Sequence, residues 1–243
     1  MRAAIHAEKA GRSWAEAGSE SRPGDVPARF PRWLRIGFWL CIAISAAAVF
    51  RRVGALLERP SRTAPGRIAQ PQLAQLDRWF ASHAALTWVH ILCALAFVAL
   101  LPLLFRSRTR PAIWLERTFL SLGLIVGLTA YAMSIHAVGG WLERSAVLVF
   151  NTLFLTSLAQ VFVAARRGDE ARKGRWTIRA VAILLGIATT RPVMGVFFAT
   201  SRITHLTPRQ FFGIAFWIGF SLNTLAIELW LRRSHFAGER LSL

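Results

Sequence analysis

Six long apolar runs are the feature that most constrains how this chain of 243 residues can fold. About 20 apolar residues, rising 1.5 Å each in a helix, cross the ~30 Å hydrocarbon core of a bilayer. A backbone that crosses lipid must satisfy its own hydrogen bonds, which a helix does. The sequence therefore predicts an all-α fold, an integral membrane bundle of six transmembrane helices. The predicted spans are Trp33–Phe50, Ala84–Phe105, Thr118–Val138, Ser145–Ala165, Arg179–Thr200 and Gln210–Leu231.

Basic residues separate these runs and indicate how the bundle is oriented. The chain carries 30 Lys and Arg against 12 Asp and Glu. The turns after the second and fourth spans are rich in them, whereas the turn after the third carries only Arg144. Because short cytoplasmic loops collect positive charge, both termini are predicted to be cytoplasmic, in a bacterial inner membrane. The expected partner is thus the lipid bilayer. Nucleic-acid binding is not indicated, since no basic helix is interleaved with aromatic residues.

The domain organisation follows from the same pattern. The first span also resembles a secretory signal peptide, because the basic stretch RFPRWLR precedes a short apolar run. An uncleaved anchor is favoured, since the basic leader is long and the run lies deep in the chain. In the loop that follows, QLAQLDRWF predicts a short interfacial helix. We expect a disordered basic cytoplasmic tail at 1–31, the first transmembrane anchor at 32–53, a periplasmic loop at 54–83, a five-helix membrane core at 84–232 and a cytoplasmic tail at 233–243.

One arginine, Arg191, lies inside the apolar stretch GIATTRPVMGVFFAT. It is expected about 18 Å from the cytoplasmic end of its span, at a level similar to that of His90 in the second span. An arginine near mid-bilayer costs roughly 2.5 to 3.5 kcal/mol, so it normally faces the bundle interior and has a partner. No carboxylate is expected at this level, because Glu228 lies near the cytoplasmic end and should pair with Arg232 or a neighbouring helix. The partner is then a bound anion.

Other polar residues are expected in the same outer half of the membrane. Together they predict a polar pocket open to the periplasm. In a structural alternative, Arg191 donates to backbone carbonyls freed by Pro192 and to the side chains of Asn151 and Tyr131, without any ligand. The candidate pocket residues are His83, His90, Tyr131, His136, Asn151, Thr190 and Arg191.

Small residues in the spans predict where helices approach closely. Gly123 and Gly127, in GLIVG, form a small-xxx-small pattern. The glycines at 213 and 219, and those at 186 and 195, are expected to act in the same way. Cys41 and Cys93 lie in apolar runs without metal-ligand spacing, so they predict neither a disulfide nor a zinc site.

Four stretches between Asp77 and Arg232 form a distinctive set: FASHAALTWVHI, ARRGDEARKGRWTIRA, GIATTRPVMGVFFAT and FFGIAFWIGFSLN. Together they resemble the bacterial multi-pass membrane proteins catalogued as domain of unknown function 2306. That family is functionally uncharacterised, so the resemblance implies a fold more than an activity. Where its members usually carry histidine, this chain has Ala112, Lys173 and, for some relatives, Asn223. The resemblance implies that a cytoplasmic haem or metal site of the family would be lost here, whereas His83 and His90 match.

Three functions stay open at this stage. The first is a redox protein that holds haem b or a quinone on its periplasmic side, with His90 and either His136 or His83 as axial ligands and Arg191 on a propionate. The second is a protein that binds or transports a small anion or amphiphile through Arg191, His90 and Tyr131. The third is a non-catalytic accessory subunit. Hydrolytic chemistry is not indicated, because the sequence has no GxSxG or HExxH motif.

Overall fold

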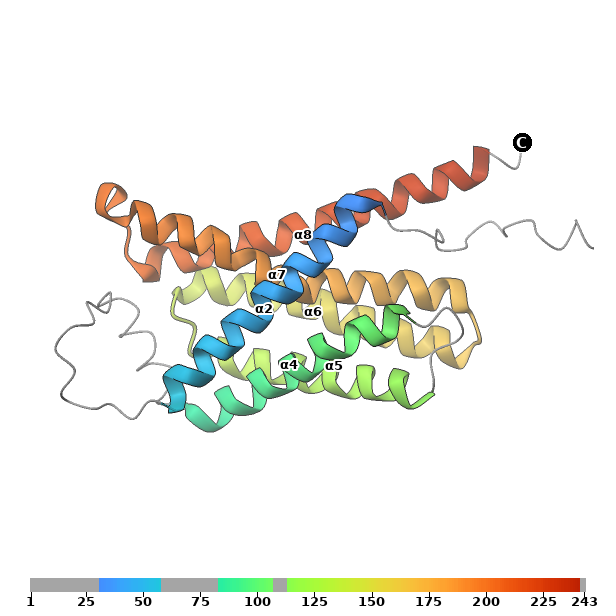
Figure 1. The fold of residues 1–243 in the computed structure, drawn as a ribbon, viewed down its shortest axis with the longest axis horizontal. Helices are drawn as coiled ribbons and strands as arrows, with labels where there is room; N and C mark the ends of the chain where they lie inside the picture. Colours follow the sequence, from blue (N-terminus) through green and yellow to red (C-terminus); the bar gives the residue numbers. More distant parts are fainter. Residues whose placement is uncertain (1–30, 58–82, 107–112, 241–243) are drawn as a thin grey trace, which may run out of the picture.

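Six helices make up the part of the chain that the computed structural model describes, residues 31–57, 83–106 and 113–240 (Figure 1). All six are long and apolar enough to cross a membrane. The prediction of an all-α bundle with six membrane-spanning helices is therefore confirmed. The helices are α2 (Arg32–Leu57), α4 (Ala84–Arg106), α5 (Ile113–Ser134), α6 (Gly140–Arg166), α7 (Glu170–Thr204) and α8 (Pro208–Arg240).

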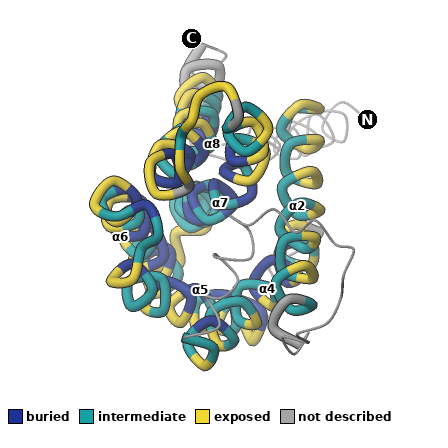
Figure 2. Tube along the Cα trace, turned by 90° about the vertical axis from the view of Figure 1, so that its left-hand side faces the viewer, coloured by how far each residue is buried: buried dark blue, intermediate teal, exposed yellow. Residues whose placement is uncertain are grey.

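Successive helices from α4 to α8 pack beside one another, whereas α2 crosses the bundle obliquely and contacts α7 and α4 (Figure 1). Viewed along the bundle, α2 and α6 lie on opposite sides, with α7 and α8 above and α4 and α5 below (Figure 2). The start of α2 and the end of α8 lie at the same end of the bundle. A chain that crosses a membrane an even number of times begins and ends on the same side of it, as the start of α2 and the end of α8 do here.

Two helices begin well before their apolar runs, and their polar first turns explain the difference. α6 starts at Gly140 instead of Ser145, after a turn in which Gly140 has a φ of +61°. Its Glu143 accepts a hydrogen bond from the Gly139 N–H over 2.5 Å, which caps the helix. α7 starts at Glu170 instead of Arg179, where Asp169 caps the Arg172 N–H over 2.9 Å. An apolar run marks the hydrocarbon span, and the helix around it is longer.

The other helix ends also shift relative to the predictions. α5 spans Ile113–Ser134, so it begins and ends about one turn before the predicted span and leaves His136 in the following turn. α2 continues to Leu57, into the predicted loop, and α8 continues to Arg240, through most of the predicted C-terminal tail. The predicted interfacial helix QLAQLDRWF and the predicted tail at 1–30 lie outside the described residues.

Glycines allow α8 to approach both α6 and α7. A Cβ added at Gly213 would lie 2.7 Å from the backbone nitrogen of Glu143, and one at Gly219 would lie 2.6 Å from Cγ2 of Thr190. The predicted close contacts at Gly123, Gly127 and Gly186 are also confirmed, against Leu158, Leu155 and Phe220 respectively. The prediction for Gly195 was wrong: a Cβ there would meet nothing within 4 Å, because the residue lines a cavity.

Ion pairs gather at the end of the bundle that holds the start of α7 and the end of α8. Glu228 accepts two hydrogen bonds from Arg179, at 2.9 and 3.2 Å, and lies 3.5 Å from Arg232. The predicted pairing of Glu228 is thus confirmed. Lys173 pairs with Glu116 at 2.6 Å and with Glu170 at 2.7 Å. These carboxylates are engaged, so they are not partners for Arg191.

Candidate intramembrane binding site

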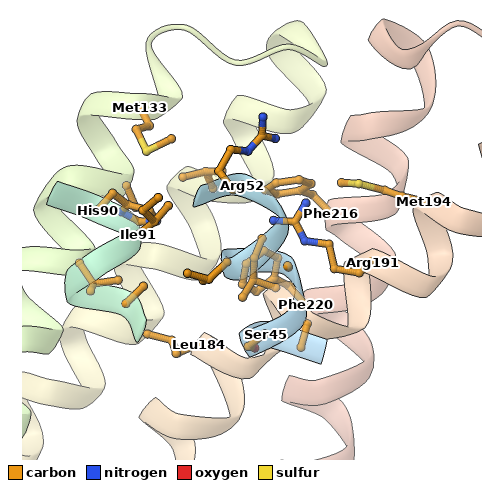
Figure 3. Close-up of a pocket in the computed structure, with 18 of the residues that line it drawn as sticks. Ser45, Arg52, His90, Ile91, Met133, Leu184, Arg191, Met194, Phe216 and Phe220 are labelled. Atoms are coloured by element: carbon orange, nitrogen blue, oxygen red, sulfur yellow. The ribbon is translucent and has the colours of Figure 1, made fainter. Parts of the chain in front are cut away.

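A cavity of about 650 Å³ lies between the six described helices, and each of them contributes to its wall (Figure 3). Most of the lining is apolar, including side chains such as Phe216 and Phe220 of α8. A small set of polar residues interrupts this wall. They are Ser45, Arg51 and Arg52 of α2, Thr87 and His90 of α4, Ser134 of α5, His136 of the turn after α5, Glu143 and Asn151 of α6, and Arg191 of α7.

Arg191 extends from α7 into this cavity (Figure 3). The surrounding helices enclose it, yet its side chain keeps a large accessible surface because that surface faces the cavity. Among the described residues it makes no hydrogen bond and no ion pair. The hydrogen bonds of the structural alternative, from Arg191 to Asn151 and Tyr131, are not present among the described residues. Asn151 Nδ2 instead donates to the Gly127 carbonyl over 2.9 Å, and the Tyr131 hydroxyl bonds with Thr152 over 2.6 Å.

Two charged side chains act on Arg191 through space: Arg51 of α2 repels it and Glu143 of α6 attracts it. Glu143 is only 9 % exposed, and its carboxylate already accepts the Gly139 N–H. The prediction that no carboxylate lies near Arg191 was therefore wrong. It failed because the apolar run starts at Ser145, which left Glu143 in a loop. The helix start GGWLE, with an acidic residue in its first turn, was the signal that could have placed it.

His90 lines the cavity from α4 and is fixed by a hydrogen bond from α5. Its Nδ1 lies 2.8 Å from Oγ1 of Thr129. Thr129 Oγ1 in turn donates to the backbone carbonyl of Ile125 over 2.7 Å. His90 and Arg191 were predicted to lie at similar depths in the membrane, and both line the same cavity.

The other two predicted histidines contact each other. The rings of His83 and His136 have centroids 4.1 Å apart and planes inclined by 37°. His136 lines the cavity, whereas His83 does not. Of the two predicted axial pairs, His90 with His136 or with His83, only the first has both rings at the cavity. Within residues 31–57, 83–106 and 113–240, no group of three or more His, Cys, Asp or Glu is arranged to hold a metal ion.

Three of the predicted pocket residues have structural roles. Tyr131 and Thr190 do not line the cavity. Thr190 is completely buried, donates to the Ile187 carbonyl over 2.6 Å and packs against Gly219. Asn151 does line the cavity, but its amide nitrogen is occupied by Gly127. It lies well inside α6, which begins at Gly140.

Sequence reasoning also missed the contribution of α2. Arg51 and Arg52 end its apolar stretch and line the cavity together with Ser45. The depth estimate applied to Arg191 and His90 would have found the two arginines, since the end of the first span reaches the same side of the membrane as the start of the second.

No family model, no curated protein and no solved structure matches the chain. The function therefore has to be inferred from the bundle and its cavity.

Proposed function

We propose that this multi-pass membrane protein binds an anionic amphiphile in the cavity between its helices. The anionic head group pairs with Arg191, and the apolar part lies along the cavity wall. One observation carries the proposal: Arg191 faces a cavity of about 650 Å³ without a hydrogen bond or ion pair among the described residues. This observation does not depend on a redox function, on an accessory role or on membership of the family that the sequence resembles.

The charges around Arg191 support an anion as the ligand. Arg191 and Arg51 repel each other, and Glu143 supplies one negative charge that also caps α6. Arg52 adds a further positive charge to the lining. Positive charges in apolar surroundings are costly unless they are paired and hydrogen-bonded. A carboxylate or phosphate bound at the Arg191 guanidinium meets both conditions for that residue, and arginine binds such groups in a bidentate manner.

The size and lining of the cavity support an amphiphile over a small inorganic ion. At about 30 Å³ for each water-sized group, the cavity holds about 20 non-hydrogen atoms. A single-chain fatty acid has this size. The largely apolar wall with a few convergent polar groups is typical of sites for apolar ligands with a polar end.

The membrane placement adds to this proposal. With both termini in the cytoplasm of a bacterial cell, the start of α4 and the turn around His136 face the periplasm. The head group would then lie towards the periplasmic leaflet of the inner membrane. Binding at this level suits a protein that receives or delivers a lipid at the outer face.

Stearate binding to the purified protein tests the proposal, with octadecanol as the uncharged probe of equal chain length. Replacing Arg191 by Met should weaken stearate binding by roughly 10-fold or more, because a charged hydrogen bond is lost, and should leave octadecanol binding unchanged. Arg191→Lys should restore part of the affinity. Arg144→Met is the matched control, since Arg144 is exposed and does not line the cavity. Equal stearate affinity in the wild type and Arg191→Met contradicts the proposal.

Haem is the second candidate, because His90 and His136 line the same cavity as Arg191, which could pair with a propionate. Haem has roughly twice as many non-hydrogen atoms as the cavity holds, so its binding would require the helices to move apart. An absorbance spectrum of the purified protein decides between the two ligands. A Soret band that disappears in His90→Phe favours haem. A spectrum without that band, together with stearate binding that depends on Arg191, favours the amphiphile.

A further inference from the structure

The hydrogen bonds of Thr129 determine which nitrogen of His90 carries the proton. A threonine hydroxyl has a single hydrogen, and Thr129 donates it to the Ile125 carbonyl over 2.7 Å. The Val126 carbonyl is a second acceptor for the same hydrogen, at 3.0 Å. Both carbonyls can only accept, so we infer that the hydrogen points to them and that the hydroxyl oxygen accepts from His90 Nδ1, 2.8 Å away. His90 Nδ1 carries a hydrogen as a result. Apolar surroundings favour the uncharged ring, in which the other nitrogen, Nε2, is a hydrogen-bond acceptor.

Among the described residues, the hydrogen bonds of His90 go to α5, to Thr129 Oγ1 through Nδ1 and to the backbone of Val126, one turn before Thr129. Because Val126 and Thr129 lie on the same side of the ring, we assign both bonds to Nδ1, which leaves Nε2 as the nitrogen available to a ligand. The buried side-chain atoms without a partner in this part of the chain are Oγ of Ser45 and Oγ1 of Thr224, so Nε2 is not sealed inside the protein. Because His90 lines the cavity, this acceptor is accessible from it. An acceptor held in a largely apolar wall favours a ligand that brings a donor, since an unpaired polar group there costs free energy.

We propose that the ligand is a hydroxylated anionic amphiphile, with its anion on Arg191 and its hydroxyl donating to Nε2 of His90. This inference rests on the proposed function and specifies its ligand class. His90 reaches the cavity from α4 and Arg191 from α7, on opposite sides in Figure 3. The hydroxyl therefore lies along the chain of the amphiphile, away from the anionic head. A long-chain hydroxy acid has this chemistry.

The tautomer of His90 gives the site a preference for donors over acceptors. A keto or methoxy group at the position of the hydroxyl presents only lone pairs to Nε2, so it cannot form the hydrogen bond. Sites that pair a buried polar group with a ligand hydroxyl reject the analogue that cannot make that bond. The preference depends on Thr129, because its hydroxyl keeps the proton on Nδ1.

Competition against labelled stearate tests the inference in the full-length protein. The probes are stearate, a series of hydroxystearates with the hydroxyl at different chain positions, and the keto acid that matches each one. At one position or more, the hydroxy acid should bind roughly 3- to 10-fold more tightly than stearate, and the matching keto acid should bind no more tightly than stearate.

Two variants assign that preference to the proposed atoms. His90→Phe keeps a ring of similar shape and should abolish the difference between hydroxy acid, keto acid and stearate. Thr129→Val keeps the shape of the side chain but frees the ring to move its proton to Nε2. It should reduce or reverse the preference for hydroxyl over keto, which a purely structural role of His90 does not predict.

The possible outcomes separate this inference from the proposed function. If stearate binding depends on Arg191 but no hydroxy acid binds more tightly, the assignment of a hydroxyl is overturned and the anion site stands. A hydroxyl preference that persists in His90→Phe also overturns it. If no probe binds in a manner that depends on Arg191, both the proposed function and this inference are overturned.

Discussion

At the scale of single residues, Arg191 and Glu143 have opposite effects on an anion in the cavity. Arg191 faces the cavity with its guanidinium group, whereas the carboxylate of Glu143 attracts that guanidinium and also caps α6 through Gly139. Electrostatic interactions are strong where water is excluded, so each charge affects ligand binding. The two residues thus provide opposite tests of the same site.

Replacing Glu143 by Gln should raise the affinity for stearate by about 3- to 10-fold, the equivalent of one modest charge interaction. The amide oxygen can still accept the Gly139 N–H, so the cap of α6 is retained. Equilibrium binding of stearate measures the change. Glu116→Gln is the control, because Glu116 pairs with Lys173 away from the cavity. Weaker stearate binding in Glu143→Gln is the opposite of the predicted sign and speaks against an anion at Arg191.

The site residues show how far sequence reasoning reaches at this scale. Depth along a helix correctly placed Arg191 and His90 in one cavity, because 1.5 Å per residue holds for any helix. Depth does not give the face of the helix. Thr190 precedes Arg191 by one residue, about 100° around the axis, and is buried against Gly219 instead of facing the cavity. Glu143 was missed because it lies in a polar first turn.

At the scale of the elements, α2 differs from the other five helices. None of its apolar window is buried, and among the described helices its main contacts are with α7 and α4. It still forms one wall of the cavity through residues such as Ser45 and Arg51. Near the middle of α2, Sγ of Cys41 lies 3.8 Å from Oγ1 of Thr189 on α7. The cavity is complete only if α2 stays attached to the mature protein.

A disulfide tests the position of α2 directly. In Thr189→Cys, the new thiol lies close enough to Cys41 for a bond to form when membranes are treated with an oxidant. The variant is made in a Cys93→Ala background, which removes the only other cysteine. Non-reducing mass spectrometry of the intact protein should show a loss of two hydrogens, absent when Cys41 is also replaced by Ser. A full-length protein that does not cross-link, or one that lacks residues 1–50, contradicts this packing.

Gly213 tests the contact between α8 and α6. Gly213→Ala should lower the free energy of unfolding by about 1 to 3 kcal/mol, because the added methyl group would meet the backbone of Glu143 at 2.7 Å. Gly195→Ala is the matched control: its methyl group would meet nothing within 4 Å, and alanine favours the helix. Thermal unfolding in detergent measures both. Equal melting temperatures for the two variants are inconsistent with the close approach.

At the scale of the whole molecule, six apolar helices give a bundle whose two ends can be distinguished. The sequence correctly predicted the six candidate spans found in the described part of the chain, because each apolar run is long enough to cross the hydrocarbon core as one helix. It did not predict where α6 and α7 begin, because polar first turns outside the hydrocarbon have no apolar signal. The distribution of arginines predicts the orientation of the bundle, which reporters can test.

A fluorescent protein fused after residue 243 should fold and fluoresce, since the positive-inside rule places that end in the cytoplasm. Alkaline phosphatase inserted at Thr207, in the turn between α7 and α8, should be active in the periplasm. The reverse pair of signals means that the cavity's arginine-lined end faces the cytoplasm. The ligand would then be received from the inner leaflet.

Native mass spectrometry of the protein released from its own membranes tests the central claim most directly. The wild type should carry a bound mass that fragments to an anionic amphiphile. That mass should be lost from Arg191→Met and retained in Arg144→Met. A wild-type protein that carries no such mass, or an Arg191→Met protein that carries the same one, contradicts an anion site at Arg191.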